Sequence, residues 1–447
     1  MACSQGGGLL TSALSVSASG PVGSRVTFSL MLRWIRLLVV VSAPLFTAWG
    51  ADASAERQEQ LATPAVLDPA RLAATLATLT PEQWEALPPE LREQLQAMLG
   101  PTWLWGATLR MGAEWRDNVL LSPVSPASRS LLRGQLESYL WRRPSGAWEW
   151  LGFLNGDVGR LLQPLPELAG EQEWFGHLES RWTPRPGWRA AWTGQAYYQD
   201  QVFDLSATET ERFVARMRVR GARTGMDLTA PLPGAFALIV GAKVHCSDYA
   251  DFAEDFTEGE GAATLRWRLE GGEKGSLTVD LGWRSRRREH PDRNQYTVGG
   301  RPLPGTQLEF RQDEVRGETT LLRGPWTLSL DAYGMENRDQ ASGYFNYTER
   351  GGQLTLERAA DRWRVLMEGG ASRSRYELQT VGVGFDPPLR RRDHRELRVR
   401  VERILGPRWT LFAEASEERS RENEAGGTYR ARLVSLGVAR TWEPSLP

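Results

Sequence analysis

The sequence predicts an all-β protein, a transmembrane antiparallel up-and-down β-barrel of about sixteen strands with a short N-terminal helical segment. Three observations support this fold class: long segments of alternating apolar and polar residues, connections that alternate between short and long, and tryptophans gathered near segment ends. A bundle of membrane helices is excluded, because the longest charge-free apolar stretch, residues 37–51, is shorter than the roughly 18 to 20 residues a spanning helix needs.

The composition excludes several classes of protein. The 447 residues carry 54 basic and 55 acidic side chains, so there is no basic excess with which to bind nucleic acid. Of the two cysteines, Cys3 precedes the expected export signal, which leaves Cys246 alone in a mature chain and excludes a disulfide framework. No metal-ligand spacing stands out, and we expect neither a metal nor another cofactor.

The beginning of the chain predicts a secretory signal over residues 1–53. A short basic segment starts at Met31, residues 37–46 form an apolar core, and small residues suited to cleavage follow. Translation is expected to begin at Met31, because the residues before it carry no strong pattern.

Residues 54–101 are expected to form a periplasmic helical leader. Asp68 and Thr80 each precede a proline at the first position of a short helix, which is a typical helix start. The leader would be either a docking or plug element or a segment that packs against the body. The barrel is expected over residues 102–442, and residues 443–447 as a periplasmic tail.

Strand alternation begins at Trp103 and continues to the end of the barrel region. Trp103, Trp105, Met111 and Trp115 share one face, and polar residues share the other. Soluble strands average about 5 to 6 residues, whereas a tilted membrane strand needs about 9 to 11. We expect strands at 102–115, 130–142, 147–159, 171–183, 188–200, 211–222, 235–247, 261–270, 275–286, 307–322, 326–338, 351–358, 362–376, 394–404, 408–420 and 428–442.

The connections predict the orientation of the barrel. Short turns are expected to face the periplasm and long loops the outside, which places both termini in the periplasm. One connection on the short side, 223–234, is longer than the rest. The longest outer loop, 287–306, would be either a constriction folded into the barrel or a solvated surface loop.

Tryptophan positions test the membrane assignment independently, since an indole favours the membrane–water boundary. A soluble sandwich with core tryptophans would not predict their clustering beside the short turns. The expected interface residues are Trp105, Trp141, Trp148, Trp182, Trp188, Trp326, Trp363, Trp409 and Trp442.

With these features, residues 102–442 resemble bacterial outer-membrane β-barrel proteins of porin-type and polysaccharide-associated barrel families. The local motif is residues 114–123, which is similar to the aromatic-Asp-Asp-Asn-Val stretch that ends the first strand in those families. Arg116 stands where those families often have Asp, which weakens the idea that Asp117 and Asn118 coordinate a cation. The resemblance implies localisation in the cell outer membrane.

The inward face is expected to line a polar lumen, because sixteen strands enclose an aqueous channel. The inward face carries side chains of both charges. These would either orient polar solutes at a constriction or form ion pairs in a plugged, structural interior. The expected lumen residues are the basic Arg216, Arg218, Arg266, Arg268, Arg284, Arg364, Arg398 and Arg400 and the acidic Glu137, Glu179, Asp280, Asp331, Glu368, Glu402 and Glu414.

Three functions remain open at this point. The favoured one is a porin-like channel for passive diffusion of small polar or anionic solutes. The alternatives are a non-conducting scaffold for surface polysaccharide export or assembly, and a lipid-modifying enzyme. No histidine has a serine at a recognised spacing, so no catalytic residues are expected. Expected partners are outer-membrane lipid and lipopolysaccharide, small polar solutes and the barrel-insertion machinery.

Overall fold

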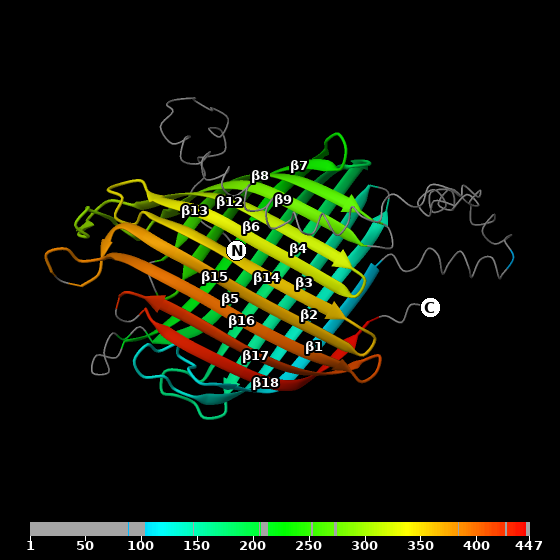
Figure 1. The fold of residues 1–447 in the computed structure, drawn as a ribbon, viewed down its shortest axis with the longest axis horizontal. Helices are drawn as coiled ribbons and strands as arrows, with labels where there is room; N and C mark the ends of the chain where they lie inside the picture. Colours follow the sequence, from blue (N-terminus) through cyan, green and yellow to red (C-terminus); the bar gives the residue numbers. More distant parts are fainter. Residues whose placement is uncertain are drawn as a thin grey trace, which may run out of the picture. The chain divides into compact units, whose positions relative to one another are not determined.

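The computed structural model describes residue 88 and residues 103–443, apart from 146, 205, 207–212, 252–253, 272–274, 383 and 425–426. This part of the chain is a closed antiparallel barrel of sixteen strands in which β1 pairs with β18 (Figure 1). The expected signal sequence, the helical leader apart from Pro88, and residues 444–447 lie outside the described residues. Within those residues, no helix is long and apolar enough to cross a membrane.

The strands follow one another around the barrel in chain order, except for a small two-stranded sheet, β10–β11, in the connection between β9 and β12. The bounds are β1 Trp103–Arg116, β2 Arg129–Ser145, β3 Trp148–Leu161, β4 Gly170–Arg185, β5 Trp188–Asp204, β6 Val214–Pro231, β7 Phe236–Tyr249, β8 Phe256–Glu270, β9 Ser276–His290, β10 Gln295–Tyr296, β11 Pro302–Leu303, β12 Leu308–Arg323, β13 Trp326–Asp339, β14 Tyr347–Ala359, β15 Trp363–Thr380, β16 Leu389–Ile404, β17 Trp409–Glu422 and β18 Tyr429–Trp442.

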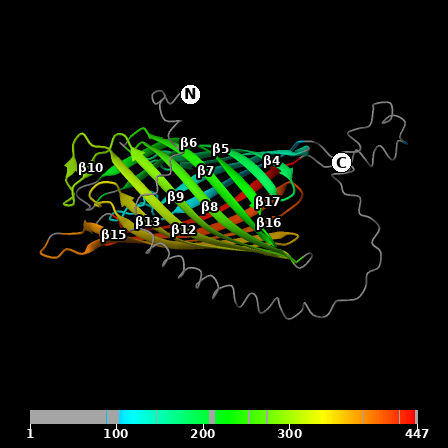
Figure 2. The ribbon, with the colours of Figure 1, turned by 90° about the horizontal axis from the view of Figure 1, so that it is seen from above.

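Short and long connections alternate, as the sequence predicts, so the barrel has one short-turn end and one long-loop end (Figures 1 and 2). Several short turns contain a glycine in the left-handed region: Gly187 has φ 80°, Gly234 has φ 76° and Gly324 has φ 55°. Glycine fits these turns because it has no Cβ to clash in that conformation. Since the strands are antiparallel, β1 begins and β18 ends at the short-turn end.

Several predicted boundaries were wrong; β8, for example, begins at Phe256 and not at residue 261. The expected connection 223–234 is mostly strand, because β6 continues to Pro231 in unbroken register with β5 and β7. The strand expected at 351–358 begins earlier, at Tyr347, so Gly351 and Gly352 lie inside β14. The ring of Tyr333 lies over Gly351, where an added Cβ would come within 2.7 Å of it, so the glycine makes room for an aromatic neighbour.

Contacts between distant strands identify the inner face of the barrel. Arg116 of β1 and Glu171 of β4 form an ion pair of 2.5 Å although β2 and β3 lie between them. Neighbouring strands are about 4.8 Å apart, so three steps cover about 14 Å, and side chains bridge that gap only where they converge on the concave face. The opposite face of β1 exposes Trp103, Trp105 and Met111. The outer wall is therefore apolar and the inner wall charged.

Candidate functional site

Most of the expected lumen residues do lie on the inner wall. The pairing register places their side chains on the face shared by Arg116 and Glu171. These residues are Glu137, Glu179, Arg266, Arg268, Asp280, Arg284, Asp331, Arg364, Glu368, Arg398, Arg400, Glu402 and Glu414.

Arg216 and Arg218 differ from this expectation, because the register of β5 with β6 places both on the outer face. Arg216 pairs with Asp200 at 2.6 Å and Arg218 with Asp251 at 2.7 Å. The physical reason is that they lie near the long-loop end of β6, where the outer face is polar and the inner face is apolar. Val219, their inward neighbour, is 4% exposed.

The first group of inner-wall charges joins β1 to β4. Glu114 is buried and accepts hydrogen bonds from Arg116 at 2.6 Å and from Arg133 at 2.8 Å. Arg116 also donates to Glu171, and Arg133 donates to Asp157 at 2.7 Å through two nitrogens. Three carboxylates therefore surround two guanidinium groups, and this part of the wall is locally acidic.

A second group lies on β16 and β17, on the other side of the β1–β18 seam. Arg398 reaches Glu368 at 3.3 Å and Glu414 at 2.9 Å, and Arg400 also donates to Glu414 at 2.6 Å. Arg110 of β1 comes within 3.8 Å of Glu402 of β16, which links this group to the first across the seam. Charge-assisted bonds of this kind orient the wall residues firmly.

The third group, on β6 to β12, has the opposite bias. Four cations surround the buried Glu260: Arg223 at 2.8 Å, Arg286 at 3.0 Å, Arg284 at 3.6 Å and Lys243 at 4.0 Å. Two further carboxylates join the group: Glu314 shares Arg284 and Arg286, and Asp227 lies 3.8 Å from Lys243, so four cations face three carboxylates. The lumen therefore presents a locally cationic wall on β6 to β12 and a locally acidic wall on β1 to β4.

The loop between β1 and β2, residues 117–128, folds inside the barrel wall. Its Val119 and Leu120 pack in a buried apolar cluster with Leu131 and Leu161, which lie on the inner faces of β2 and β3. The carbonyl of Leu120 accepts a hydrogen bond of 2.8 Å from the backbone N–H of Asp204, at the end of β5. This loop therefore crosses the inner faces of β2 to β4, and we refer to it as the constriction loop.

The motif at residues 114–123 anchors the constriction loop. Asn118 is 1% exposed; its side-chain oxygen accepts from the N–H of Ser122 and its amide donates to the carbonyl of Ser122, both at 2.8 Å. The same amide donates to the carbonyl of Arg430 on β18 at 3.1 Å. Leu121 has φ 53°, a conformation that costs about 1 to 3 kcal/mol in a non-glycine residue. The chain therefore holds a defined, strained loop.

The constriction loop borders a cavity of about 700 Å³ on the lumen side. Asn118 and Leu121 line it from the loop, Arg133 and Asp157 from β2 and β3, and Arg398 from β16. Sequence reasoning missed this loop, since its inward course depends on apolar contacts with strands far along the chain. Its one sequence signal was the apolar run Val119–Leu121 in an otherwise polar connection.

The loop expected at 287–306 is shorter than predicted and contacts a neighbouring loop. The β9 strand extends to His290, and the loop beyond it packs against the neighbouring connection 340–346. Tyr296 stacks on Tyr344 with ring centroids 5.7 Å apart, and its carbonyl accepts a hydrogen bond of 2.6 Å from Ser342. These contacts join two neighbouring loops at the rim.

Most of the expected interface tryptophans lie on the outer face at the short-turn end. Arginines cover several of these rings: Arg358 lies 5.3 Å from the centroid of Trp326, and Arg403 lies 5.5 Å from that of Trp363. Trp141 instead lies on the inner face, where its Nε1 donates to Glu149 at 2.7 Å. The outward tryptophans are Trp105, Trp148, Trp182, Trp188, Trp326, Trp363, Trp409 and Trp442.

Two of the histidines, His177 and His245, lie on the inner wall and contact neighbouring side chains. His177 packs on Phe153 with centroids 5.1 Å apart and shares a hydrogen bond of 3.1 Å with Gln195. His245 bonds the hydroxyl of Tyr197 at 2.9 Å. In the part of the chain that the structure describes, no group of three or more His, Cys, Asp or Glu residues is placed to hold a metal ion.

The described residues have the architecture of a transmembrane up-and-down β-barrel. No family model and no curated protein matches the chain. Among solved structures, it is similar to OccAB3 of Acinetobacter baumannii, with 12% identity, a TM-score of 0.39, and coverage of 76% of this chain and 99% of that one. It is also similar to an anion-selective porin from Comamonas acidovorans, with 10% identity, a TM-score of 0.38 and the same coverage. The outer membrane protein opdK of Pseudomonas aeruginosa shows 10% identity, a TM-score of 0.40 and the same coverage.

Proposed function

We propose that the protein is a porin-like channel through which small polar or anionic solutes diffuse passively across the outer membrane. The observation that supports this most directly is the charged inner wall narrowed by the constriction loop, beside which a cavity of about 700 Å³ remains. A sixteen-strand ring is wide enough for an aqueous channel. Ion pairs within the wall hold the long charged side chains near the strands, which favours an open interior.

The two biased walls suggest how the channel would select solutes. Guanidinium groups around Glu260 on one side and carboxylates around Arg133 on the other create a field across the lumen. A small polar solute would align its dipole with that field at the constriction. Anionic groups would be drawn to Arg284 and Arg286, whose donors suit planar oxyanions.

The orientation in the membrane is part of this proposal. The short-turn end would face the periplasm together with both termini, and the constriction loop at the long-loop end would face outward. The outward tryptophans would sit at the periplasmic interface, with arginines such as Arg358 and Arg403 between the rings and the lipid phosphates.

Single-channel conductance of the refolded protein in a planar bilayer tests the proposal. Stable open steps are expected, and absence of conductance would contradict the channel. The double variant Arg284→Gln, Arg316→Gln should shift selectivity toward cations, because both side chains are inward and partly exposed. The matched double variant Arg216→Gln, Arg218→Gln removes the same charge from the outer face and should leave selectivity unchanged.

The role of the constriction loop has its own test. Asn118→Ala removes the bonds to Ser122 and Arg430, so the loop should be released and single-channel conductance should rise. Asn346→Ala is the matched control, since Asn346 holds a different loop by accepting from the N–H of Asp339 at 2.8 Å. Equal conductance of both variants and the wild type would show that residues 117–128 do not limit the flow.

A further inference from the structure

The outer face of β14 to β17 carries a concentration of arginines near the long-loop end. The pairing register places arginines directly opposite one another on neighbouring strands, which is normally unfavourable because like charges repel. We define the arginine patch by these three opposed pairs: Arg350 with Arg373, Arg375 with Arg391, and Arg395 with Arg419.

Carboxylates are scarce around the arginine patch. Among the described residues, its only ion pair is that of Arg373 with Asp393. The flanking acids are engaged elsewhere: Glu417 pairs with Arg430 at 2.6 Å, and Glu377 accepts from the side-chain amide of Asn346 at 3.2 Å. The six arginines are all exposed, so the patch keeps a strong positive charge that the protein itself does not balance.

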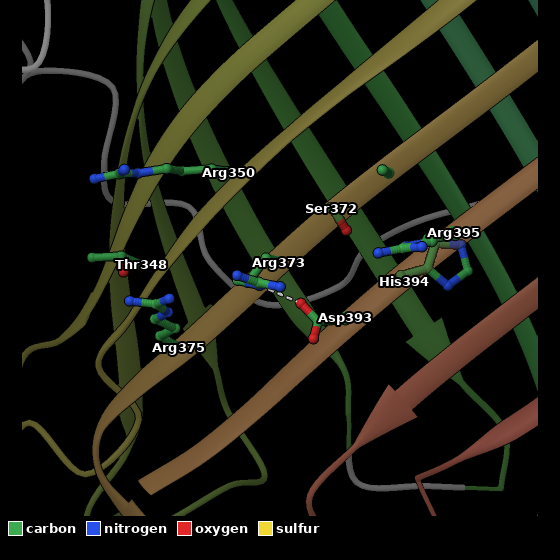
Figure 3. Close-up of a pocket in the computed structure, with 9 residues that line it drawn as sticks. Thr348, Arg350, Ser372, Arg373, Arg375, Asp393, His394 and Arg395 are labelled. Atoms are coloured by element: carbon green, nitrogen blue, oxygen red, sulfur yellow. Dashed lines mark hydrogen bonds and ion pairs between the residues drawn. The ribbon is translucent and has the colours of Figure 1, made fainter. Parts of the chain in front are cut away.

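The patch forms a recess in the outer surface. A hollow of about 410 Å³ is lined by Arg350, Arg373, Arg375 and Arg395, with Ala371 among them. Figure 3 shows these four arginines spread over three neighbouring strands, with Asp393 held by Arg373. A neighbouring hollow of about 270 Å³ extends the recess to Arg419. Several guanidinium groups can therefore reach one ligand together.

The position of the recess relative to the apolar wall suggests what occupies it. On β15 the outward positions run from Trp363 through the exposed Val365 and Met367 to Ala371, and then change to Arg373. Trp363 to Arg373 covers about 25 Å along the barrel axis at about 3.3 Å per residue and a tilt of about 40°, which matches the height of the apolar band of such barrels. The arginines therefore begin where the hydrocarbon of the outer leaflet would end.

We propose that the arginine patch is a binding site for lipopolysaccharide, in which the guanidinium groups hold the phosphates of the lipid A headgroup. Guanidinium binds phosphate oxygens through paired, charge-assisted hydrogen bonds, and opposed arginines can share one phosphate between two strands. The acyl chains would lie along Leu354, Met367 and Leu397, which are exposed on the outer face directly below. The site rests on the membrane orientation proposed above and does not require an open channel.

Lipid binding by the full-length refolded protein tests the site. Purified lipopolysaccharide is the probe, and the same lipid after enzymatic removal of its phosphates is the comparison. The triple variant Arg375→Gln, Arg395→Gln, Arg419→Gln should weaken lipopolysaccharide binding about tenfold or more, since it removes several charge-assisted contacts. The control triple variant Arg216→Gln, Arg218→Gln, Arg220→Gln, whose arginines already pair with aspartates, should weaken it much less.

The outcomes separate the possible sources of the phosphate. Tight binding of the intact lipid, weak binding of the dephosphorylated lipid, and no displacement by millimolar inorganic phosphate would support the lipid site. Equal binding by the patch variant and the wild type would overturn it, as would equal affinity for both lipids or displacement by inorganic phosphate alone. Folding is checked by the shift in gel mobility on heating.

Single-channel conductance of the same patch variant distinguishes this inference from the proposed function. The patch lies outside the lumen, so its loss should weaken lipopolysaccharide binding while conductance stays at the wild-type level. Loss of conductance without loss of lipid binding would contradict the assignment of the patch to the outer surface.

Discussion

The outward arginines at the long-loop end fall into two arcs that balance their charge differently. In the arc around β6, each arginine has its own carboxylate: Arg216 pairs with Asp200, Arg218 with Asp251, and Arg220 with Asp248 at 2.6 Å. On β14 to β17, the arginine patch has three opposed arginine pairs and one bound carboxylate. Residue type and height on the barrel are similar in both arcs, so the number of acids makes the difference.

This contrast shows two ways in which arginines near the long-loop end can be arranged. Carboxylates of the protein can neutralise them, or they can lack such partners and be available to an external anion. In the β6 arc, carboxylates occupy the donors of the arginines, and a further anion gains little there. In the arginine patch, the arginines other than Arg373 form no ion pair among the described residues, so their donors can bind an anion. The inner wall is the most densely paired case, because the buried Glu260 shares four cations.

The largest effect is expected where one buried carboxylate serves the most cations. Glu260→Gln leaves four inward cations without their shared carboxylate and should lower the free energy of unfolding by about 2 kcal/mol. Denaturant unfolding of the barrel in detergent micelles measures the change. Glu318→Gln is the control, since this exposed inward acid forms none of the ion pairs found among the described residues, and it should cost little. Similar losses of unfolding free energy in both variants would contradict the conclusion that Glu260 stabilises the fold by pairing with these cations.

The second-largest effect is expected when an arginine of the β6 arc loses the carboxylate that pairs with it. Asp200 is 5% exposed and accepts from Arg216 at 2.8 and 2.6 Å, so Asp200→Asn should cost about 1 to 2 kcal/mol of unfolding free energy. It should also raise lipopolysaccharide binding, because Arg216 becomes free. Asp248→Asn breaks a far more exposed pair and should cost clearly less. Equal costs for the two would show that burial does not set the strength of these pairs.

The opposite change would balance the arginine patch. Arg395→Glu places a carboxylate directly opposite Arg419 and should raise the unfolding free energy in lipid-free detergent by about 0.5 kcal/mol. Thermal unfolding with and without lipopolysaccharide checks the result, and added lipid should stabilise this variant less than the wild type. A variant that gains equally from the lipid would argue against the binding site.

The smallest effect is a dependence on pH in the β6 arc. The hydrogen bond from Arg218 lowers the pKa of Asp251, which lies in the loop after β7. A carboxyl with a lowered folded-state pKa stabilises the fold above its unfolded pKa, near 3.9, and loses that contribution as the pH falls through the folded value. The stability difference between wild type and Asp251→Asn should thus hold down to about pH 4 and vanish below it. A difference that already disappears at pH 5 would contradict the pairing.

Much of the fold could be predicted because strand alternation is a local signal. The closed sixteen-strand barrel, the alternating connections and most inward charges follow from period-two patterns and loop lengths. The error at Arg216 and Arg218 has a physical cause in β6. Its apolar residues are inward up to Val219 and outward from Ala222, while the register with β5 does not slip. The environment changes there, from covering loops to membrane, and sequence periodicity alone cannot distinguish such a change from a change of face.

The constriction loop and the arginine patch could not be predicted for a related reason. Both arise from residues that the sequence separates widely, such as Asn118 with Arg430, or Arg350 with Arg419. The registers of several consecutive hairpins fix these encounters, and an error of one residue in any hairpin would move a side chain to the other face. The tertiary structure was needed to reveal them.

The anchoring of the constriction loop has a consequence for biogenesis. Asp117 and Asn118 bond the backbone of Arg432 and Arg430, so the first loop is tied to the last strand. The constriction loop can take its final position only after β18 has paired with β1. During assembly, therefore, the constriction loop should reach its place among the last events. A barrel in which β1 and β18 are not yet paired should still have a wide entrance at the long-loop end.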